Sequence, residues 1–196
     1  MSSFQDDLLL VERAQGGDRT AFDDLVYKYE QRAYQYAYRL TGSSDEASDI
    51  VANAFVRVYN ALPNFKGQAA FTTWLYRIIT NCYLDAKKKV KNKQTISLDS
   101  NVGADGSEQE MQIESGDDTP LEIAERNQRE RIMQDALLKL PEYQRAMLIM
   151  YHVDGLAYEE ISDSLDLPLG TVKSRLNRAR MALRDILKNE MELFSV

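Results

Sequence analysis

Apolar residues recur every three or four positions along most of the chain, which is the spacing of one face of an α-helix. In the first half this pattern predicts helices over about 8–15, 18–40, 44–62 and 71–89. In the second half it predicts helices over about 120–139, 142–153, 157–165 and 169–190. No alternating pattern of useful length indicates a β-strand, so we expect an all-α fold.

Polar residues mark several of the predicted helix ends. Asp18 and Ser43 suit the N-cap position, and Gly42 suits the end of the second helix. Thr119 precedes Pro120 and stands three positions before Glu122, which combines an N-cap, a first-position proline and a capping-box acid. We therefore expect an abrupt helix start at residue 120.

The middle of the chain differs from both halves in charge and composition. Residues 97–125 contain nine acidic residues and no Lys or Arg, with several Gly and Ser and few apolar side chains. Such a composition is typical of a disordered linker. The net charge of the whole chain is −7, whereas residues 1–94 alone carry +2. The sequence thus predicts two small helical domains, residues 1–94 and 120–196, joined by an acidic linker over 95–119.

Residues 158–184 have the plan of a helix-turn-helix: a short helix, a tight turn and a longer basic helix. Between Thr171 and Lys188 there are six positive residues and one acid. The small Ser162 suits a close crossing of the two helices, and Asp166 suits a turn position that needs a left-handed backbone. The apolar residues share one face of the longer helix: Val172, Leu176, Ala179, Leu183 and Leu187.

A second face of this basic helix, near its N-terminal end, carries Lys173, Ser174, Asn177 and Arg178. Recognition helices touch base edges with this part of the helix. Arg and Lys suit guanine, Asn suits adenine, and Ser can serve either base. An alternative is an amphipathic surface helix whose charges are merely solvated. The turn, the small crossing residue and the spacing favour duplex DNA binding.

Residues 65–93 combine aromatic side chains with a run of lysines. The aromatic residues are Phe65, Phe71, Trp74, Tyr76 and Tyr83, and the lysines are Lys87, Lys88, Lys89, Lys91 and Lys93. Aromatic faces can stack on unpaired bases while lysines hold the backbone, so the segment suits single-stranded nucleic acid. The alternative remains open that Phe71 and Trp74 belong to the core and that the lysines are solvated.

Other functional classes find little support in the sequence. There is no Gly-rich phosphate loop and no metal-ligand cluster, so we expect no cofactor, no metal and no enzyme activity. The single cysteine, Cys82, excludes an internal disulfide. No run of about 20 apolar residues could span a membrane. The N-terminus lacks the pattern of a signal peptide, so a soluble cytoplasmic protein is expected.

These features together resemble an extracytoplasmic-function (group four) RNA polymerase sigma factor over nearly the whole chain. Residues 45–55 look like the polymerase-binding helix of sigma region two, and residues 71–78 look like the segment that melts and reads the minus-ten element. Residues 158–161 and 168–176 look like region four, which reads the minus-thirty-five element. The chain departs from the family where Ala52-Asn53 replaces the usual Gln-Glu.

The resemblance implies three sets of binding residues. Core RNA polymerase would contact Asp49, Val51, Phe55 and Arg57. The minus-ten DNA, duplex and then melted, would contact Lys66, Gln68, Phe71, Trp74, Tyr76, Asn81, Lys87 and Lys88. The minus-thirty-five duplex would contact Thr171, Lys173, Ser174, Arg175, Asn177 and Arg178. The resemblance also implies an anti-sigma protein as a partner, and a linker that passes through positively charged polymerase channels.

Two other functions remain open at this point. One is an autonomous helix-turn-helix regulator that binds only duplex DNA. The other is an interaction protein that binds polymerase and sequesters it. The aromatic and lysine-rich segment distinguishes the first from a sigma factor, because a duplex-only binder has no use for stacking on exposed bases.

Overall fold

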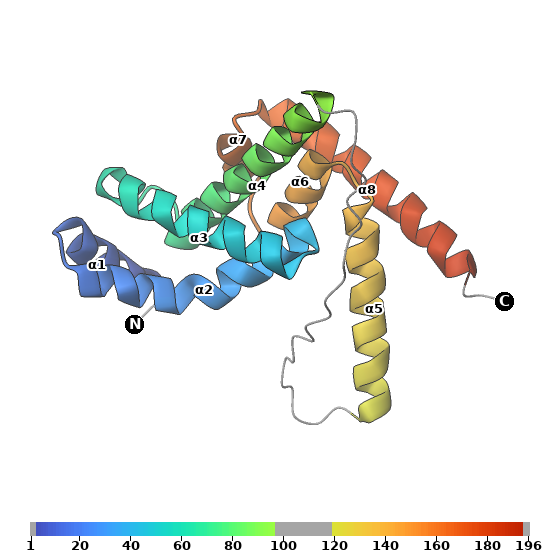
Figure 1. The fold of residues 1–196 in the computed structure, drawn as a ribbon, viewed down its shortest axis with the longest axis horizontal. Helices are drawn as coiled ribbons and strands as arrows, with labels where there is room; N and C mark the ends of the chain where they lie inside the picture. Colours follow the sequence, from blue (N-terminus) through green and yellow to red (C-terminus); the bar gives the residue numbers. More distant parts are fainter. Residues whose placement is uncertain (1–2, 97–118, 194–196) are drawn as a thin grey trace.

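The computed structural model describes residues 3–96 and 119–193, and within these ranges every regular element is helical. The predicted all-α fold is therefore confirmed for the described residues. The predicted linker lies almost entirely outside them. The helices are α1 (Ser3–Gln15), α2 (Arg19–Thr41), α3 (Ser44–Ala61), the 3-10 turn η1 (Leu62–Asn64), α4 (Phe71–Ile96), α5 (Pro120–Leu138), α6 (Glu142–His152), α7 (Tyr158–Leu165) and α8 (Leu169–Leu193) (Figure 1).

The predicted capping residues lie at helix ends. The Asp18 carboxylate accepts hydrogen bonds from the amides of Thr20 and Ala21, and Gly42 ends α2 in a left-handed conformation. Hydrogen bonds from Thr20 and Arg13 lower the pKa of Asp18 to about 2. At the start of α5 both halves of the predicted capping box form, between Thr119 and Glu122.

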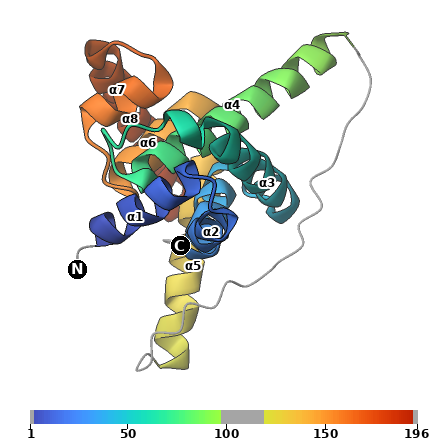
Figure 2. The same cartoon turned by 90° about the vertical axis from the view of Figure 1, so that its left-hand side faces the viewer.

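Three helices are longer than predicted: α1 begins at Ser3, α8 ends at Leu193, and α4 has the largest extension. α4 continues to Ile96 instead of ending near Lys89. The additional residues include lysine, asparagine and glutamine but no proline or glycine. Lysine and glutamine have good helix propensity, and nothing in this stretch interrupts the backbone hydrogen bonds. The C-terminal part of α4 therefore extends beyond the body of the protein, as does α5 (Figure 2).

In the first half α2 packs against α1, α3 and α4. The α2 side chains Leu25, Tyr29 and Tyr36 are almost completely buried, together with Leu75 and Ile79 of α4. In the second half α8 packs against α5, α6 and α7, and the buried residues there include Met147, Met150, Ile161, Val172 and Leu176.

The two halves also pack against each other. α2 contacts α5 and α6, and α4 contacts α6 and α7. Gln134 of α5 donates hydrogen bonds to the carbonyl oxygens of Tyr38 and Arg39 at the end of α2. A Cβ atom added to Gly42 would lie 2.4 Å from the Leu138 side chain, so glycine permits this close approach of the second half.

Candidate nucleic-acid interface

The helix-turn-helix consists of α7, a short turn and α8. Asp166 ends α7 with φ 51° and ψ 51°, so the predicted left-handed backbone is confirmed at this position. The Ser162 hydroxyl donates to the carbonyl oxygen of Leu167, and the Leu167 amide donates to the carbonyl oxygen of Ser162. These reciprocal hydrogen bonds fix the turn that sets the direction of α8.

The faces of α8 are divided as the spacing predicts. Val172, Leu176 and Ala179 are fully buried against the rest of the second half. Thr171 at the start of the helix is half-buried. The other predicted contacts with the minus-thirty-five element are all exposed: Lys173, Ser174, Arg175, Asn177 and Arg178. The apolar face of α8 is therefore buried in the second half of the protein, and its opposite, polar and basic face is exposed.

Not every positive residue on α8 points freely into solvent. The Arg180 guanidinium lies 4.7 Å from the ring centroid of Tyr151, and its Nε donates to Nε2 of His152. This hydrogen bond requires an unprotonated Nε2, which agrees with the pKa of His152 being lowered by burial and by the charge of Arg180. Arg180 thus links α8 to α6.

The aromatic residues around the start of α4 form one cluster. The ring of Trp74 lies 4.6 Å from Phe65 and 5.9 Å from Phe71 by centroid distance. Phe71 is only 3% exposed and packs against Tyr29, whereas Trp74 is half-buried. In this conformation Phe71 is a core residue, as the alternative interpretation of this segment anticipated.

The loop that precedes α4 carries two of the predicted minus-ten residues. Lys66 and Gln68 are exposed there, on either side of Gly67, whose φ is 66°. The Gln15 side chain donates to the carbonyl oxygens of Leu62 and Phe65, both at 2.8 Å, and so ties the loop to α1. The loop presents two flexible polar side chains on a fixed backbone.

The remaining minus-ten candidates lie along α4. Tyr76 stacks on Tyr36 with 4.6 Å between centroids, and Asn81 is half-buried. Lys87 forms a 2.7 Å ion pair with Glu46 of α3, whereas Lys88 is exposed. The structure therefore does not present all these residues on one open surface.

The predicted polymerase-binding residues lie on α3. Asp49 and Arg57 are exposed, and Arg57 forms a 3.0 Å ion pair with Asp85 of α4. Val51 and Phe55 are half-buried at the edge of the core. Asn53, one of the two residues that depart from the family pattern, donates to the carbonyl oxygen of Asp49.

Sequence reasoning missed two apolar side chains on α3. Val56 is 62% exposed and Tyr59 is 51% exposed, and the Tyr59 ring packs edge-on against Phe22. Val56 and Tyr59 are three positions apart and lie on a different face of α3 from the buried Ile50, Ala54 and Val58. That second apolar phase was the available signal in the sequence of these exposed apolar side chains.

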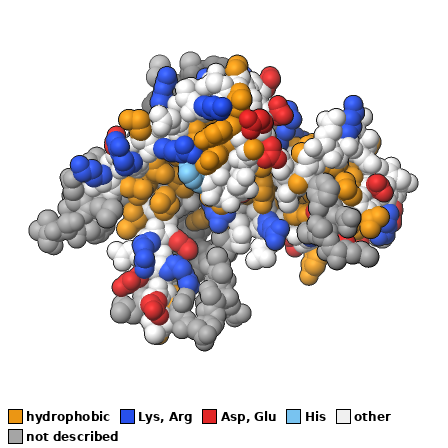
Figure 3. Space-filling model, turned by 180° about the vertical axis from the view of Figure 1, so that it is seen from behind, with side chains coloured by type: hydrophobic (Ala, Val, Ile, Leu, Met, Phe, Trp, Pro, Cys, Tyr) orange, Lys and Arg blue, Asp and Glu red, His pale blue; other side chains and the backbone are white. Residues whose placement is uncertain are grey.

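A hydrophobic groove lies between α5, α6 and α8 (Figure 3). Its volume is about 880 Å³, and its apolar lining includes Met133, Leu148, Val153, Leu183 and Leu187. The basic residues Arg180, Arg184 and Lys188 also line it. The groove thus combines an apolar floor with positive charge.

The described residues contain no cluster of His, Cys, Asp and Glu suited to a metal ion. Cys82 is buried, and burial raises the pKa of its thiol. Among the helices of residues 3–96 and 119–193, none is both long and apolar enough to cross a membrane.

Comparisons with known proteins identify both halves of the chain. The family model of sigma-70 region 2 matches residues 17–93, and that of sigma-70 region 4 matches residues 130–183. The ECF RNA polymerase sigma factor SigW of Bacillus subtilis (strain 168) is 36% identical, over 91% of this chain and 95% of that protein. The ECF RNA polymerase sigma-E factor of Escherichia coli (strain K12) is 37% identical, over 93% and 95% of the two chains.

Two solved structures have a similar fold. The sigma factor RpoE of Bartonella quintana, in complex with the anti-sigma factor NepR, matches with a TM-score of 0.66 at 21% identity, over 85% of this chain and 96% of that chain. CnrH, in complex with the cytosolic domain of CnrY, matches with a TM-score of 0.64 at 23% identity, over 94% and 98%. The two family models and the relatives at 36% and 37% identity span both halves, which favours a sigma factor over an autonomous helix-turn-helix regulator. The chain belongs to the sigma-70 family, as an ECF RNA polymerase sigma factor.

Proposed function

We propose that this sigma factor binds core RNA polymerase, positions it on two promoter elements and holds the melted DNA strand, without catalysing a reaction itself. The observation that carries the proposal is the division of α8: Val172 and Leu176 are buried, whereas Lys173, Asn177 and Arg178 are exposed. A helix anchored in this way presents its polar face at a fixed angle to the major groove.

At the minus-thirty-five element, Lys173, Ser174, Asn177 and Arg178 read base edges. Arg and Lys pair with guanine and Asn pairs with adenine, through geometries that other bases cannot match. Thr171 and Arg175 flank this face and hold phosphates, which set the register of the protein on the duplex.

At the minus-ten element, the loop over residues 65–70 receives a base that leaves the duplex. Lys66 and Gln68 are exposed on this loop, and Trp74 lies behind it in the aromatic cluster with Phe65. Extracting a base costs a few kcal/mol, which contacts in a pocket must offset. Phe71 supports the cluster from the core.

Along α4, Tyr76, Asn81, Lys87 and Lys88 follow the melted strand. Lys88 is exposed, whereas Lys87 is paired with Glu46 and must exchange that carboxylate for a phosphate. Such an exposed ion pair contributes little to stability, so breaking it costs little free energy.

Core polymerase binds the outward surface of α3. Asp49 and Arg57 supply charges, Val51 and Phe55 supply an apolar edge, and Val56 extends that edge. Ala52 and Asn53 offer less charge here than the Gln-Glu of the family pattern. We expect this departure to alter the affinity for the core enzyme.

The proposed domain boundaries remain 1–94, 95–119 and 120–196. The acidic linker over 95–119 passes through positively charged channels of the polymerase, and in the free protein its charge discourages loose binding to DNA. Replacing its acids by Ser and Asn should therefore weaken initiation. Unchanged initiation would contradict both roles.

We also propose regulation by an anti-sigma protein in the cytoplasm. The sigma factor RpoE, which has a similar fold, was solved in complex with the anti-sigma factor NepR, and CnrH was solved in complex with the cytosolic domain of CnrY. The groove between α5, α6 and α8 suits an amphipathic helix with acidic flanks, because such a helix complements both its apolar floor and its positive charge.

Run-off transcription with purified core polymerase tests the proposed function directly. The template is a pool of promoter fragments, and the reaction is run with and without the protein. Specific transcripts that require the protein support the proposal, and their start sites locate both promoter elements. Binding to core polymerase without any transcript would instead favour a protein that sequesters the enzyme.

A further inference from the structure

The loop over residues 65–70, which receives a base in the proposed function, lies outside any helix. Helical hydrogen bonds therefore do not fix its backbone, and contacts with other elements must hold its shape. Gln15, the last residue of α1, supplies two such contacts, because its Nε2 donates to the carbonyl oxygens of Leu62 and Phe65, both at 2.8 Å. One side-chain amide thus joins the end of α1 to η1 and to the first residue of the loop.

α1 also contacts the loop at Gly67. The φ of this glycine is 66°, which side chains rarely tolerate, and a Cβ atom added there would lie 3.4 Å from a methyl carbon of Leu8. Lys66 and Gln68, which are assigned to the extracted base, are exposed on either side of Gly67. α1 therefore supports the loop at the point where these two side chains leave the backbone.

α1 is itself anchored in the core of the first half. Asp7 is only 6% exposed, and its carboxylate accepts a hydrogen bond from the Tyr29 hydroxyl. Burial and the hydrogen bond to Asp7 raise the pKa of Tyr29, so the hydroxyl stays protonated and can donate. The Tyr29 ring in turn lies 5.2 Å from that of Phe71 by centroid distance. The helix that carries Gln15 is thus fixed to the same aromatic core that supports Trp74.

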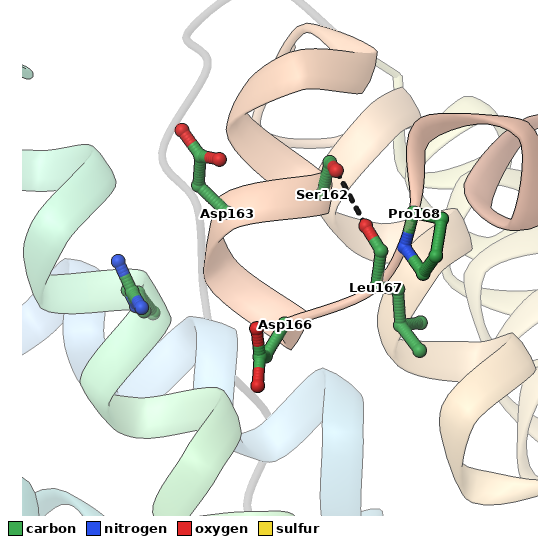
Figure 4. Close-up of a pocket in the computed structure, with 6 residues that line it drawn as sticks. Ser162, Asp163, Asp166, Leu167 and Pro168 are labelled. Carbon is green, nitrogen blue, oxygen red and sulfur yellow. Dashed lines mark hydrogen bonds between the residues drawn. The ribbon is translucent and has the colours of Figure 1, made fainter.

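The turn before α8 is held by a similar contact. There the Ser162 hydroxyl of α7 donates to the carbonyl oxygen of Leu167 in the turn (Figure 4). In both halves a side chain on a helix therefore fixes the backbone of a non-helical segment, and each segment leads into a helix assigned to DNA. The contact of Gln15 differs in range, because it reaches Phe65 across 50 positions of the chain.

We propose that Gln15 is a positioning residue for the minus-ten element, which holds the loop over residues 65–70 in the shape that receives the base. The proposal rests on the proposed function, which assigns this loop to the base. A loop that already has its bound shape binds more tightly, because no entropy is lost in ordering it. Gln15 acts through the backbone of the loop, and its own side chain does not need to touch DNA.

Trp74 reports the state of the loop directly, because it is the only tryptophan in the chain and its ring lies 4.6 Å from that of Phe65. The variant Gln15→Met keeps the length of the side chain but removes the amide donor. In the full chain without DNA, we expect the emission of Trp74 to shift to the red and to be quenched more strongly by acrylamide. The control Gln31→Met makes the same change at an exposed position of α2 and should leave both quantities unchanged.

Run-off transcription tests whether Gln15 acts through the loop. The promoter is one recovered with the wild-type protein and core polymerase. Gln15→Met alone should lower transcription about fivefold, a factor within the range of one neutral hydrogen bond. In a chain that already carries Lys66→Ala and Gln68→Ala, the same change should lower transcription by less than about twofold, because residues that act through one contact are not additive.

The outcomes separate this inference from the proposed function. Reduced transcription with unchanged Trp74 emission would show that Gln15 touches DNA itself, and it would overturn the positioning role. A fivefold loss in both backgrounds would also overturn it. Absence of transcripts with the wild-type protein would contradict the proposed function, whereas the emission of Trp74 in the free protein would still show whether Gln15 holds the loop.

Discussion

The guanidinium of Arg145 on α6 donates a 2.6 Å hydrogen bond to the carbonyl oxygen of Leu40 near the end of α2. The same side chain donates to the carbonyl oxygens of Leu137, Leu138 and Leu140. The last carbonyl groups of a helix lack partners within that helix. Arg145 therefore satisfies the ends of α2 and α5 together, and it joins the two halves of the molecule through one buried charge.

Replacement of Arg145 by Ala should be strongly destabilising. The variant leaves carbonyl groups near two helix ends without a buried donor, and hydrogen bonds to a charged group contribute about 1.5–3 kcal/mol each. We expect the free energy of unfolding to fall by about 3 kcal/mol or more, measured by urea denaturation at neutral pH.

Two further variants serve as comparisons for the unfolding free energy of the Arg145→Ala variant. Arg145→Lys keeps the charge but loses the planar fork of donors, so we expect an intermediate loss. Lys89→Ala removes an exposed charge from α4 and should change stability by less than about 0.5 kcal/mol. Equal stability of the Ala variant and the wild-type protein would show that the four hydrogen bonds contribute nothing.

The buried carboxyl group of Asp154 predicts that the stability of the folded protein decreases as the pH rises. Burial raises the pKa of its carboxyl from 3.8 to about 7, partly opposed by Arg39. The native state therefore binds the proton more tightly than the unfolded state, so the stabilisation is complete below pH 4 and is lost as the pH rises toward 7. The three-unit difference sets an upper limit of about 4 kcal/mol on this loss.

The variant Asp154→Asn cannot ionise, so it should lose this part of the pH dependence. Denaturation curves at pH 5 and pH 8 measure the difference. We expect the variant to be more stable than the wild-type protein at pH 8, and its stability to change less between the two pH values. The same slope in both proteins would assign the pH dependence to other groups.

The local features of the fold followed from short sequence signals. The cap at Asp18, the capping box at Thr119 and the left-handed Asp166 each depend on residues within a few positions. Helix spacing likewise identified the buried face of α8. These predictions succeeded because the physical cause and its effect are close together in the chain.

The contacts between the halves had no comparable signal. Arg145 reaches Leu40 across 105 positions, and in the sequence it is one charged residue in an apolar helix. Nothing in the spacing of residues along α4 indicated that α7 would lie against it. The aromatic segment was ambiguous for a related reason: packing against Tyr29 places Phe71 in the core, and that partner lies on another helix.

Lys66 and Gln68 should affect promoter opening without affecting stability. Both side chains are exposed on the loop before α4, so their replacement by Ala leaves the core intact. We expect the double variant to lose about tenfold in transcription from a duplex promoter, since about 1.4 kcal/mol of strand binding corresponds to that factor. The loss should shrink on a template melted in advance. An equal loss on both templates would contradict a role in melting.

Asn177 and Arg178 should determine preference at the minus-thirty-five element. Both side chains are exposed, and in the proposed function each pairs with a base edge, so that loss of such a pair costs about 1–3 kcal/mol of discrimination. Binding of holoenzyme to promoters with single substitutions measures the change, and Ala variants should tolerate the wrong base at one position. Arg184→Ala is the control, because its side chain pairs with Asp185 away from that face and should leave base preference unchanged.

Val56 should be required for binding to core polymerase. Its side chain is 62% exposed on α3, so Val56→Asp has little effect on folding but places a charge in the proposed apolar contact. We expect the affinity for core polymerase to fall about tenfold or more, measured by competition with a labelled sigma factor. Val90→Asp is the matched control, because Val90 is 49% exposed on α4, away from the proposed contact on α3. If both variants bind core polymerase as tightly as the wild-type protein, the contact with the enzyme does not include this part of α3.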